Sequence, residues 1–327
     1  MGTGISSEKI DLLIYGPTKP LINNGFSDRF MLHTCESAGD LERVPADAAA
    51  RIRGIAVTGL VPTNGAALAS FPKVEIISSF GVGYDHIDAK WAAEQGIIVT
   101  NTPDVLTEEV ADIALGLFIA TAREFIQADK YVRSGLWATQ QYPLTVGSLR
   151  DRKVGMVGMG RIGQAIARRL DASLVPVVYH SRNPAKDVSY QHYPNLVEMA
   201  KAVDTLIVIT PGGPSTKNLV NAEVMKALGP RGIIVNVARG SVIDEPAMIE
   251  ALKSGTILAA GLDVFAQEPK VPDELKAMQN VVLLPHVGSA SVVTRNAMDQ
   301  LVIDNLKLWF DGKPPQTPIP ETPLKAR

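Results

Sequence analysis

The fold is decided by one stretch of the sequence, Val154-Gly155-Met156-Val157-Gly158-Met159-Gly160-Arg161-Ile162-Gly163. Its first four residues predict a buried strand, and the residues from Ile162 to Leu170 have the apolar spacing of a helix. Between them lies a G-x-G-x-x-G pattern, whose glycines permit a tight turn and a close approach of the backbone to a pyrophosphate. The following helix N-terminus offers free N–H groups to that anion. In this context the pattern predicts a dinucleotide-binding turn; the alternative is a glycine-rich turn without a ligand.

The rest of the chain alternates short apolar runs with helix-like stretches, which favours parallel sheets with crossover helices. From residue 153 onward six strands are predicted, at 154–157, 175–179, 205–209, 233–237, 258–262 and 281–284. Six is the strand count of a doubly wound nucleotide-binding fold. Four earlier strands are predicted at 11–15, 54–58, 74–78 and 96–100. One long amphipathic segment is predicted over 104–134 and a last helix over 292–310. The length of 327 residues favours two domains.

Composition and charge argue against several classes of protein. With 46% hydrophobic residues and a formal net charge of -2, the chain has no electrostatic reason to bind nucleic acid or an anionic membrane. Cys35 is the only cysteine, so no intrachain disulfide can form and a reducing compartment is expected. No apolar run reaches the ~18 residues of a membrane helix, and the start lacks a signal-peptide pattern. A weak myristoylation pattern at Met1–Ser6 is interpreted as a chance match. We expect a cytoplasmic protein without a nucleic-acid partner, a membrane partner or a metal site.

The residues after the strand at 175–179 predict which dinucleotide is bound. NAD sites usually carry Asp or Glu about 20 residues after the glycines, to bond the ribose 2′-hydroxyl. Here the strand is followed by His180-Ser181-Arg182-Asn183-Pro184, with Lys186 just beyond and no carboxylate at that place. Arg182 can pair with a 2′-phosphate through two donors, whereas a carboxylate would repel it. NADPH is therefore the expected cofactor, with NADH possible. The other interpretation is that Arg182 stacks on the adenine of NAD.

Three later strands end in polar residues. Their segments are Val235–Ser241, Gly261–Pro269 and Leu283–Ser289. In open α/β sheets ligands bind outside the carboxyl ends of the strands, so these ends are expected to form a site. Together they offer Arg239, Glu268 and His286.

These three side chains are the parts needed to reduce a 2-keto acid. Arg239 can hold the substrate carboxylate and polarise the keto oxygen, and protonated His286 can donate a proton to that oxygen. Glu268 can orient the imidazole and stabilise the imidazolium. The alternatives are a surface ion pair for Arg239, a structural role for His286, and a turn beginning at Glu268-Pro269.

The sequence resembles the D-isomer-specific 2-hydroxyacid dehydrogenase family over nearly its whole length. The resemblance rests on Gly158–Gly163, Asn236–Asp244, Gly261–Pro269 and Pro285–Ser291, which occur in the family's order and spacing. It implies the same three roles for Arg239, Glu268 and His286. It also implies that the backbone N–H groups of Val82 and Gly83 bind the substrate carboxylate and that Asp263 orients the nicotinamide amide.

The resemblance further implies two doubly wound parallel-sheet domains with the catalytic site in the cleft between them. A flavodoxin-like substrate domain is expected over 1–102 and 292–327, with a Rossmann domain inserted over 103–291. The segment 104–134 is expected to help build a homodimer.

Within the family the Ser181-Arg182 pair makes the chain most similar to NADPH-dependent glyoxylate/hydroxypyruvate reductases and related hydroxyphenylpyruvate reductases. The implied reaction reduces small 2-keto acids such as glyoxylate, hydroxypyruvate or aryl pyruvates to D-2-hydroxy acids. Formate dehydrogenases have glutamine where Glu268 stands, and long phosphoglycerate dehydrogenases add a regulatory domain for which no length remains. The alternative function is a dinucleotide-sensing interaction protein similar to corepressors on the same scaffold.

The expected cofactor contacts come from the glycine turn, the loop after the strand at 175–179, and later strand ends. They are Gly158, Met159, Gly160, Arg161, Ile162, Gly163, Ser181, Arg182, Asn183, Lys186, Thr210, Pro211, Val237, Ala238, Asp263 and Gly288. Five residues are either pocket walls or packing residues: Leu60, Phe80, Tyr84, Trp137 and Tyr142. The other histidines lack metal-ligand neighbours in sequence and receive no chemical role: His33, His86, His180 and His192.

Overall fold

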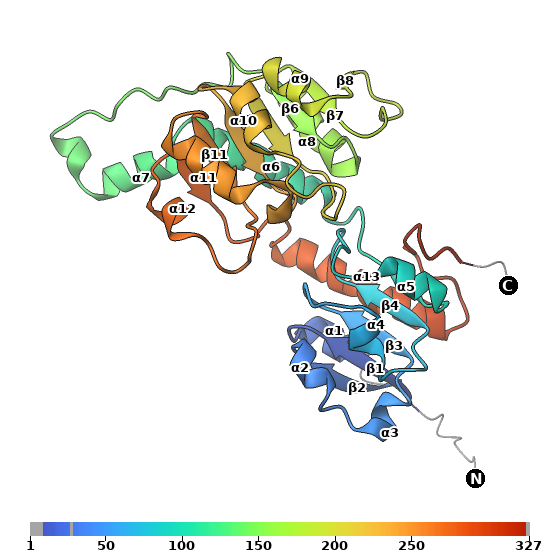
Figure 1. Ribbon diagram of the computed structural model, residues 1–327. Helices are drawn as coiled ribbons and strands as arrows, with labels where there is room; N and C mark the ends of the chain where they lie inside the picture. Colours follow the sequence, from blue (N-terminus) through green and yellow to red (C-terminus); the bar gives the residue numbers. More distant parts are fainter. Residues whose placement is uncertain (1–8, 27–28, 325–327) are drawn as a thin grey trace, which may run out of the picture. The chain divides into compact units, whose positions relative to one another are not determined.

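A computed structural model describes residues 9–26 and 29–324 (Figure 1). The chain forms two compact units, one made of Met1–Leu106 with Ser291–Arg327 and the other of Thr107–Ala290. Each contains one sheet in which every strand pairing is parallel. The predicted α/β class with two doubly wound sheets is therefore confirmed. The myristoylation pattern at the N-terminus lies outside the described residues.

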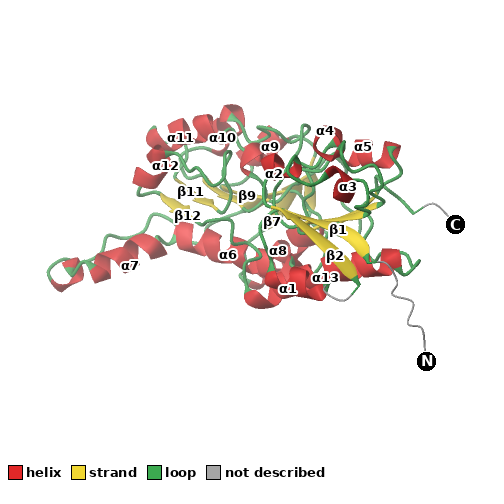
Figure 2. Ribbon diagram, turned by 90° about the horizontal axis from the view of Figure 1, so that it is seen from below, coloured by secondary structure: helices red, strands yellow, loops and turns green. Residues whose placement is uncertain are grey.

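The first unit has a five-stranded sheet in the order β2-β1-β3-β4-β5, which is the flavodoxin-like order. Its strands are β1 Ile10–Tyr15, β2 Phe30–Cys35, β3 Gly54–Val57, β4 Ile76–Ser79 and β5 Ile98–Thr100. Its helices are α1 Pro20–Gly25, α2 Ala38–Leu41, α3 Ala46–Ala49, α4 Gly65–Leu68, α5 Ala89–Glu94 and α13 Val292–Phe310. Helices α1 and α13 cover one face of the sheet, and α4 and α5 lie on the other (Figure 2). Because both faces are covered, β3 is buried throughout.

The second unit has a seven-stranded sheet in the order β12-β11-β10-β9-β6-β7-β8, with α6 and α8 on one face and α9, α10 and α11 on the other (Figure 2). Its strands are β6 Val154–Val157, β7 Val177–His180, β8 Gln191–Tyr193, β9 Thr205–Val208, β10 Ile233–Asn236, β11 Ala259–Leu262 and β12 Val281–Leu283. Its helices are α6 Thr107–Ala122, α7 Phe125–Arg133, α8 Arg161–Ala172, α9 Leu196–Lys201, α10 Ala222–Leu228, α11 Glu245–Lys253 and α12 Asp273–Ala277. The six predicted strands are present, and β8 is an additional strand at the edge.

The segment predicted as one amphipathic stretch over 104–134 is two helices. Helix α6 ends at Ala122, and Glu124 has a φ of 55°, which no helical residue adopts. Tyr142 donates a hydrogen bond of 2.8 Å to the Glu124 carboxylate at this break. Helix α6 packs against α8 and the sheet, whereas α7 has no buried residue and extends away from the rest of its unit (Figure 1). The expectation of a single helix over this segment was therefore wrong.

Within the described residues, no helix combines the length and the apolar character needed to cross a membrane.

Candidate active site

The predicted dinucleotide-binding turn joins β6 to α8. A Cβ atom on Gly163 would lie 2.6 Å from the carbonyl oxygen of Gly158, so the first turn of α8 can pack against the strand end only with glycine at this position. Gly160 is the N-cap of α8, and no described side chain caps this helix by hydrogen bonding. The N-terminus of this twelve-residue helix therefore has no side-chain cap, and the partial positive charge of such a helix end suits an anion.

The loop after β7 carries the residues predicted to bind the 2′-phosphate. Arg182, Asn183 and Lys186 are all exposed on it. The Ser181 hydroxyl donates a hydrogen bond of 2.6 Å to the carbonyl oxygen of Asn183, which folds the loop tightly around Arg182. The exposed cations and the absence of a carboxylate at the end of β7 favour a ribose that carries a 2′-phosphate.

The end of β10 holds Arg239 through the side chain of Asn236. The Asn236 side-chain oxygen accepts a hydrogen bond of 3.0 Å from the N–H of Ala238, and its amide nitrogen donates one of 3.0 Å to the carbonyl oxygen of Arg239. A Cβ atom on Gly240 would lie 1.8 Å from the carbonyl carbon of Phe265. Glycine at this position therefore lets the end of β10 touch the backbone of the loop that carries Glu268. Sequence reasoning assigned Asn236 and Gly240 no role, although both lie in the segment that it singled out.

His286 and Glu268 form a close pair. The Nδ1 atom of His286 lies 2.6 Å from Glu268 Oε2, while Glu268 Oε1 accepts a hydrogen bond of 3.0 Å from the N–H of Phe265. A carboxylate only accepts, so Nδ1 carries the hydrogen and Nε2 is the ring atom left for a substrate. Burial raises the pKa of Glu268, but the His286 and Phe265 hydrogen bonds and the charges of His286 and Arg239 outweigh it. The net pKa is below the ordinary value, so Glu268 is a carboxylate at neutral pH.

The backbone of His286 is held in a strained conformation by Asp263. His286 has a φ of 54°, in the left-handed region that non-glycine residues rarely adopt. The two carboxylate oxygens of Asp263 accept hydrogen bonds of 2.7 Å from the N–H of Val287 and 2.8 Å from that of Gly288. Burial raises the pKa of Asp263, and these two N–H groups partly oppose the rise. Asp263 therefore shapes the turn that directs His286, a contact that no sequence pattern indicated.

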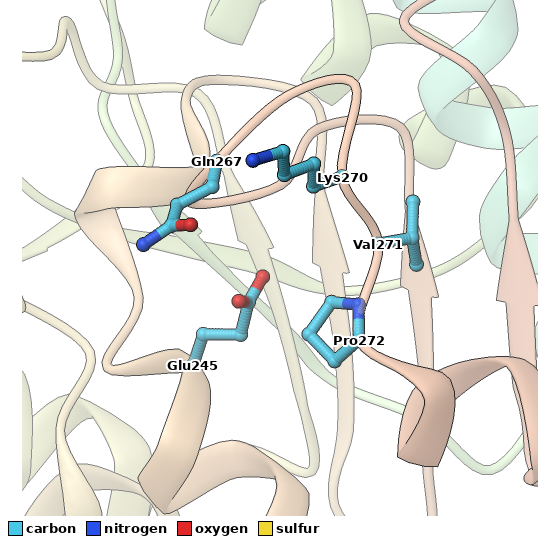
Figure 3. Close-up of a pocket in the computed structure, with 5 residues that line it drawn as sticks. All are labelled: Glu245, Gln267, Lys270, Val271 and Pro272. Carbon is cyan, nitrogen blue, oxygen red and sulfur yellow. The ribbon is translucent and has the colours of Figure 1, made fainter.

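A small open hollow of about 260 Å³ lies beside the loop that carries Glu268 (Figure 3). It is lined by Glu245, Gln267, Lys270, Val271 and Pro272. Glu245 begins α11, and its carboxylate accepts a hydrogen bond of 3.1 Å from the N–H of Ala266. This contact attaches the loop to α11 and restricts the movement of Glu268.

The family model for the NAD-binding domain of D-isomer-specific 2-hydroxyacid dehydrogenases matches residues 115–288, which include the glycine turn, Arg239, Glu268 and His286. The chain belongs to this family. The resemblance predicted from the sequence is thereby confirmed.

Relatives of this dehydrogenase include several named reductases. It is 42% identical to a glyoxylate/hydroxypyruvate reductase A of Arabidopsis thaliana, over 95% of this chain and 99% of the relative. It is 41% identical to a hydroxyphenylpyruvate reductase of Plectranthus scutellarioides, with the same coverage. A crystal structure of an NADPH-dependent glyoxylate/hydroxypyruvate reductase from Sinorhizobium meliloti, in complex with NADP and malonate, matches with a TM-score of 0.93 and 50% identity, covering 98% of this chain and 99% of that chain.

The first unit of this dehydrogenase holds the residues predicted to bind the substrate carboxylate. Val82 and Gly83 follow β4, and Asn101 donates a hydrogen bond of 2.9 Å to the carbonyl oxygen of Val82. Thr102 supports the same loop by accepting a hydrogen bond of 2.9 Å from the N–H of Gly81. Asn101 and Thr102 therefore hold the loop that carries Val82 and Gly83.

The five residues predicted as pocket walls or packing residues differ in their surroundings. Phe80 is buried, with the Nζ atom of Lys19 at 3.6 Å from its ring centroid. The Tyr84 hydroxyl donates to the carboxylate of Glu321, as that of Tyr142 does to Glu124. Leu60 and Trp137 are exposed. The two tyrosine hydroxyls therefore have structural partners within their own units.

Proposed function

We propose that this dehydrogenase reduces small 2-keto acids, with glyoxylate and hydroxypyruvate as the first candidates, to D-2-hydroxy acids using NADPH. The observation that carries the proposal is the 2.6 Å contact between Glu268 and His286, next to Arg239, on neighbouring strand ends of a family-type nucleotide-binding sheet. The names of the relatives support the class of substrate.

The residues present fit a dinucleotide with a 2′-phosphate. The uncapped N-terminus of α8 suits the pyrophosphate, and Arg182 and Lys186 provide exposed positive charge beyond β7. The Sinorhizobium meliloti reductase, which is described as NADPH-dependent, supports the same preference. When bound, the reduced nicotinamide supplies the hydride.

The chain's own residues supply charge and protons. We assign Arg239 to the substrate carboxylate and keto oxygen, where its positive charge polarises the carbonyl group. The backbone N–H groups of Val82 and Gly83 are assigned to the same carboxylate, by family resemblance. Protonated His286 donates from Nε2 to the keto oxygen as negative charge develops there. Glu268 keeps Nδ1 protonated and stabilises the imidazolium until the proton leaves.

The first test measures the loss of NADPH absorbance with glyoxylate, hydroxypyruvate, pyruvate and phenylpyruvate, and repeats each assay with NADH. Turnover that depends on NADPH, lost in His286→Ala and with a strongly raised KM in Arg239→Ala, is the expected result. Turnover with NADH alone would overturn the cofactor assignment but keep the reaction. Retained turnover in both variants would overturn the catalytic assignment. Tight NADPH binding without turnover would favour a dinucleotide-sensing protein.

We also propose that the protein is a homodimer, in the cytoplasm, with α7 in the interface. Helix α7 has no buried residue, and its unit exposes Phe125, Val132, Leu136 and Trp137 along this helix and the turn that follows. Exposed apolar side chains gathered in this way are typical of an interaction site. Replacing Val132 and Leu136 together by Glu should convert the dimer to a monomer in sedimentation equilibrium. The matched control is Asp129→Lys with Lys130→Asp on the same helix, and a mass of 35.0 kDa for the unaltered chain would refute the proposal.

A further inference from the structure

Two histidines without an assigned role lie at the two ends of the loop that carries Arg182. His180 is the last residue of β7, and its Nδ1 atom lies 2.8 Å from the carbonyl oxygen of Tyr193. His192 lies in the middle of β8, and its Nε2 atom lies 2.9 Å from the carbonyl oxygen of Ser181. Because a carbonyl oxygen only accepts, each of these ring nitrogens carries a hydrogen. His180 therefore bonds the residue after His192, and His192 bonds the residue after His180.

These two bonds close the loop at the residue before Arg182. The carbonyl group of Ser181 and the N–H of Arg182 belong to one planar peptide unit. A hydrogen bond from His192 to that carbonyl oxygen therefore fixes the plane from which Arg182 extends. Strand β8 is a three-residue edge strand with a neighbour on one side only. Its backbone hydrogen bonds to that neighbour therefore hold the loop weakly. The histidine bonds supply the missing restraint.

Further contacts connect the same histidine to the middle of the loop. The rings of Tyr179 and His192 lie with their centroids 5.1 Å apart. The buried Tyr179 accepts a hydrogen bond of 3.0 Å at its hydroxyl oxygen from the N–H of Ala185, one residue before Lys186. The segment from Ser181 to Lys186 is thus attached at both ends, while Arg182 itself stays exposed. A binding loop that is ordered before the ligand arrives loses less entropy on binding.

We propose that His192, together with His180, is a positioning residue that preorders the loop for the cofactor's 2′-phosphate and so sets the preference for NADPH over NADH. The inference rests on the NADPH assignment made above. A histidine that only attached β8 to the sheet would affect both cofactors alike. A positioning histidine affects NADPH alone, because NADH has no 2′-phosphate to meet Arg182.

The test compares Kd for NADPH and NADH, from nicotinamide fluorescence, in the full-length protein. His192→Phe keeps an aromatic ring beside Tyr179 but removes the donor, and His192→Gln keeps a donor N–H at similar reach. We expect His192→Phe to lower the NADPH preference about tenfold, as expected for the loss of a hydrogen bond and the order that it maintains. His192→Gln should restore most of the preference. Gln191→Leu, an exposed change on the same strand, should leave it unchanged.

Arg182→Ala separates this inference from the proposed function. If the unaltered protein shows no NADPH preference, or keeps it in Arg182→Ala, the cofactor assignment fails. If Arg182→Ala loses the preference and His192→Phe keeps it, the cofactor assignment stands and the inference is overturned. Equal weakening of both cofactors in His192→Phe also overturns it. Should that variant not fold, as judged by thermal melting, His180→Phe removes the reciprocal bond and carries the same test.

Discussion

Replacing Glu268 by Gln should lower kcat/KM for reduction about tenfold at neutral pH. The side chain keeps its size, but the negative charge 2.6 Å from His286 Nδ1 is lost. Reduction requires the imidazolium, and the carboxylate stabilises that charged form. Without the carboxylate, the charged ring that donates the proton is less stable, so the reduction is slower.

The size of the effect follows from the exposure of the pair. A hydrogen bond to a charged group contributes roughly 1.5–3 kcal/mol. The side chains of His286 and Glu268 are 35% and 24% exposed, so water screens the interaction and the lower end applies. We expect a loss of about 1.5 kcal/mol of stabilisation, which corresponds to a roughly tenfold lower kcat/KM. The pKa of Glu268 lies below its ordinary value, so the carboxylate is charged in the unaltered enzyme at neutral pH.

The assay is kcat/KM for glyoxylate with NADPH at pH 7, in a buffer of constant ionic strength. Glu274→Gln, which removes an exposed carboxylate on α12, is the matched control and should leave kcat/KM unchanged. Equal values of kcat/KM in Glu268→Gln and in the unaltered enzyme would refute the reasoning.

Three further changes test contacts within the second unit. Gly240→Ala places a Cβ atom 1.8 Å from the Phe265 carbonyl carbon. We expect kcat/KM to fall by a factor on the order of one hundred, as for misplaced catalytic groups, and the melting temperature to fall as well. Unchanged kinetics would contradict the importance of this contact. Arg152→Met removes the buried Arg152 Nη1 donor that bonds the carbonyl oxygens of Asp204 and Arg231. It should reduce the free energy of unfolding by about 2 kcal/mol in urea titration, and a reduction of less than about 1 kcal/mol would contradict this expectation. Tyr142→Phe removes the 2.8 Å hydrogen bond to Glu124. It should lower the free energy of unfolding by about 1 kcal/mol and the melting temperature by roughly 2–4 °C. An unchanged melting temperature would mean that this hydrogen bond does not stabilise the break between α6 and α7.

Apolar strands could be predicted from sequence, including the edge strands β5 and β12, and the two polar edge strands could not. The runs at 54–57 and 233–235 are continuously apolar because helices cover both faces of their sheets. Strand β2 contains His33 and Thr34, and β8 consists of Gln191, His192 and Tyr193. A strand at the edge of a sheet can carry polar side chains, and the composition of these two strands resembles that of a loop. The two strands missing from the prediction are both at sheet edges.

The same limit applies to the candidate site. The segments with polar strand ends were visible in sequence because charged residues follow apolar runs, and the structure brings His286 and Glu268 together. The contacts that hold them were not visible. Asp263 bonds the N–H groups of Val287 and Gly288, 24 and 25 residues later in the chain, and a local pattern carries no information on such a pairing. The break at Glu124 likewise depends on Tyr142, which is 18 residues away.

The order of the strands separates two properties of the protein. Arg239 follows β10 and Arg182 follows β7, and β9 and β6 lie between these strands. Three steps at the usual spacing of about 4.8 Å put the two strand ends roughly 14 Å apart, beyond the range over which substitutions usually interact. Changes that alter the choice of nucleotide should therefore combine additively with changes that alter the choice of keto acid. Substitutions can then change the preference for one nucleotide without altering the preference for one keto acid, and the reverse also holds.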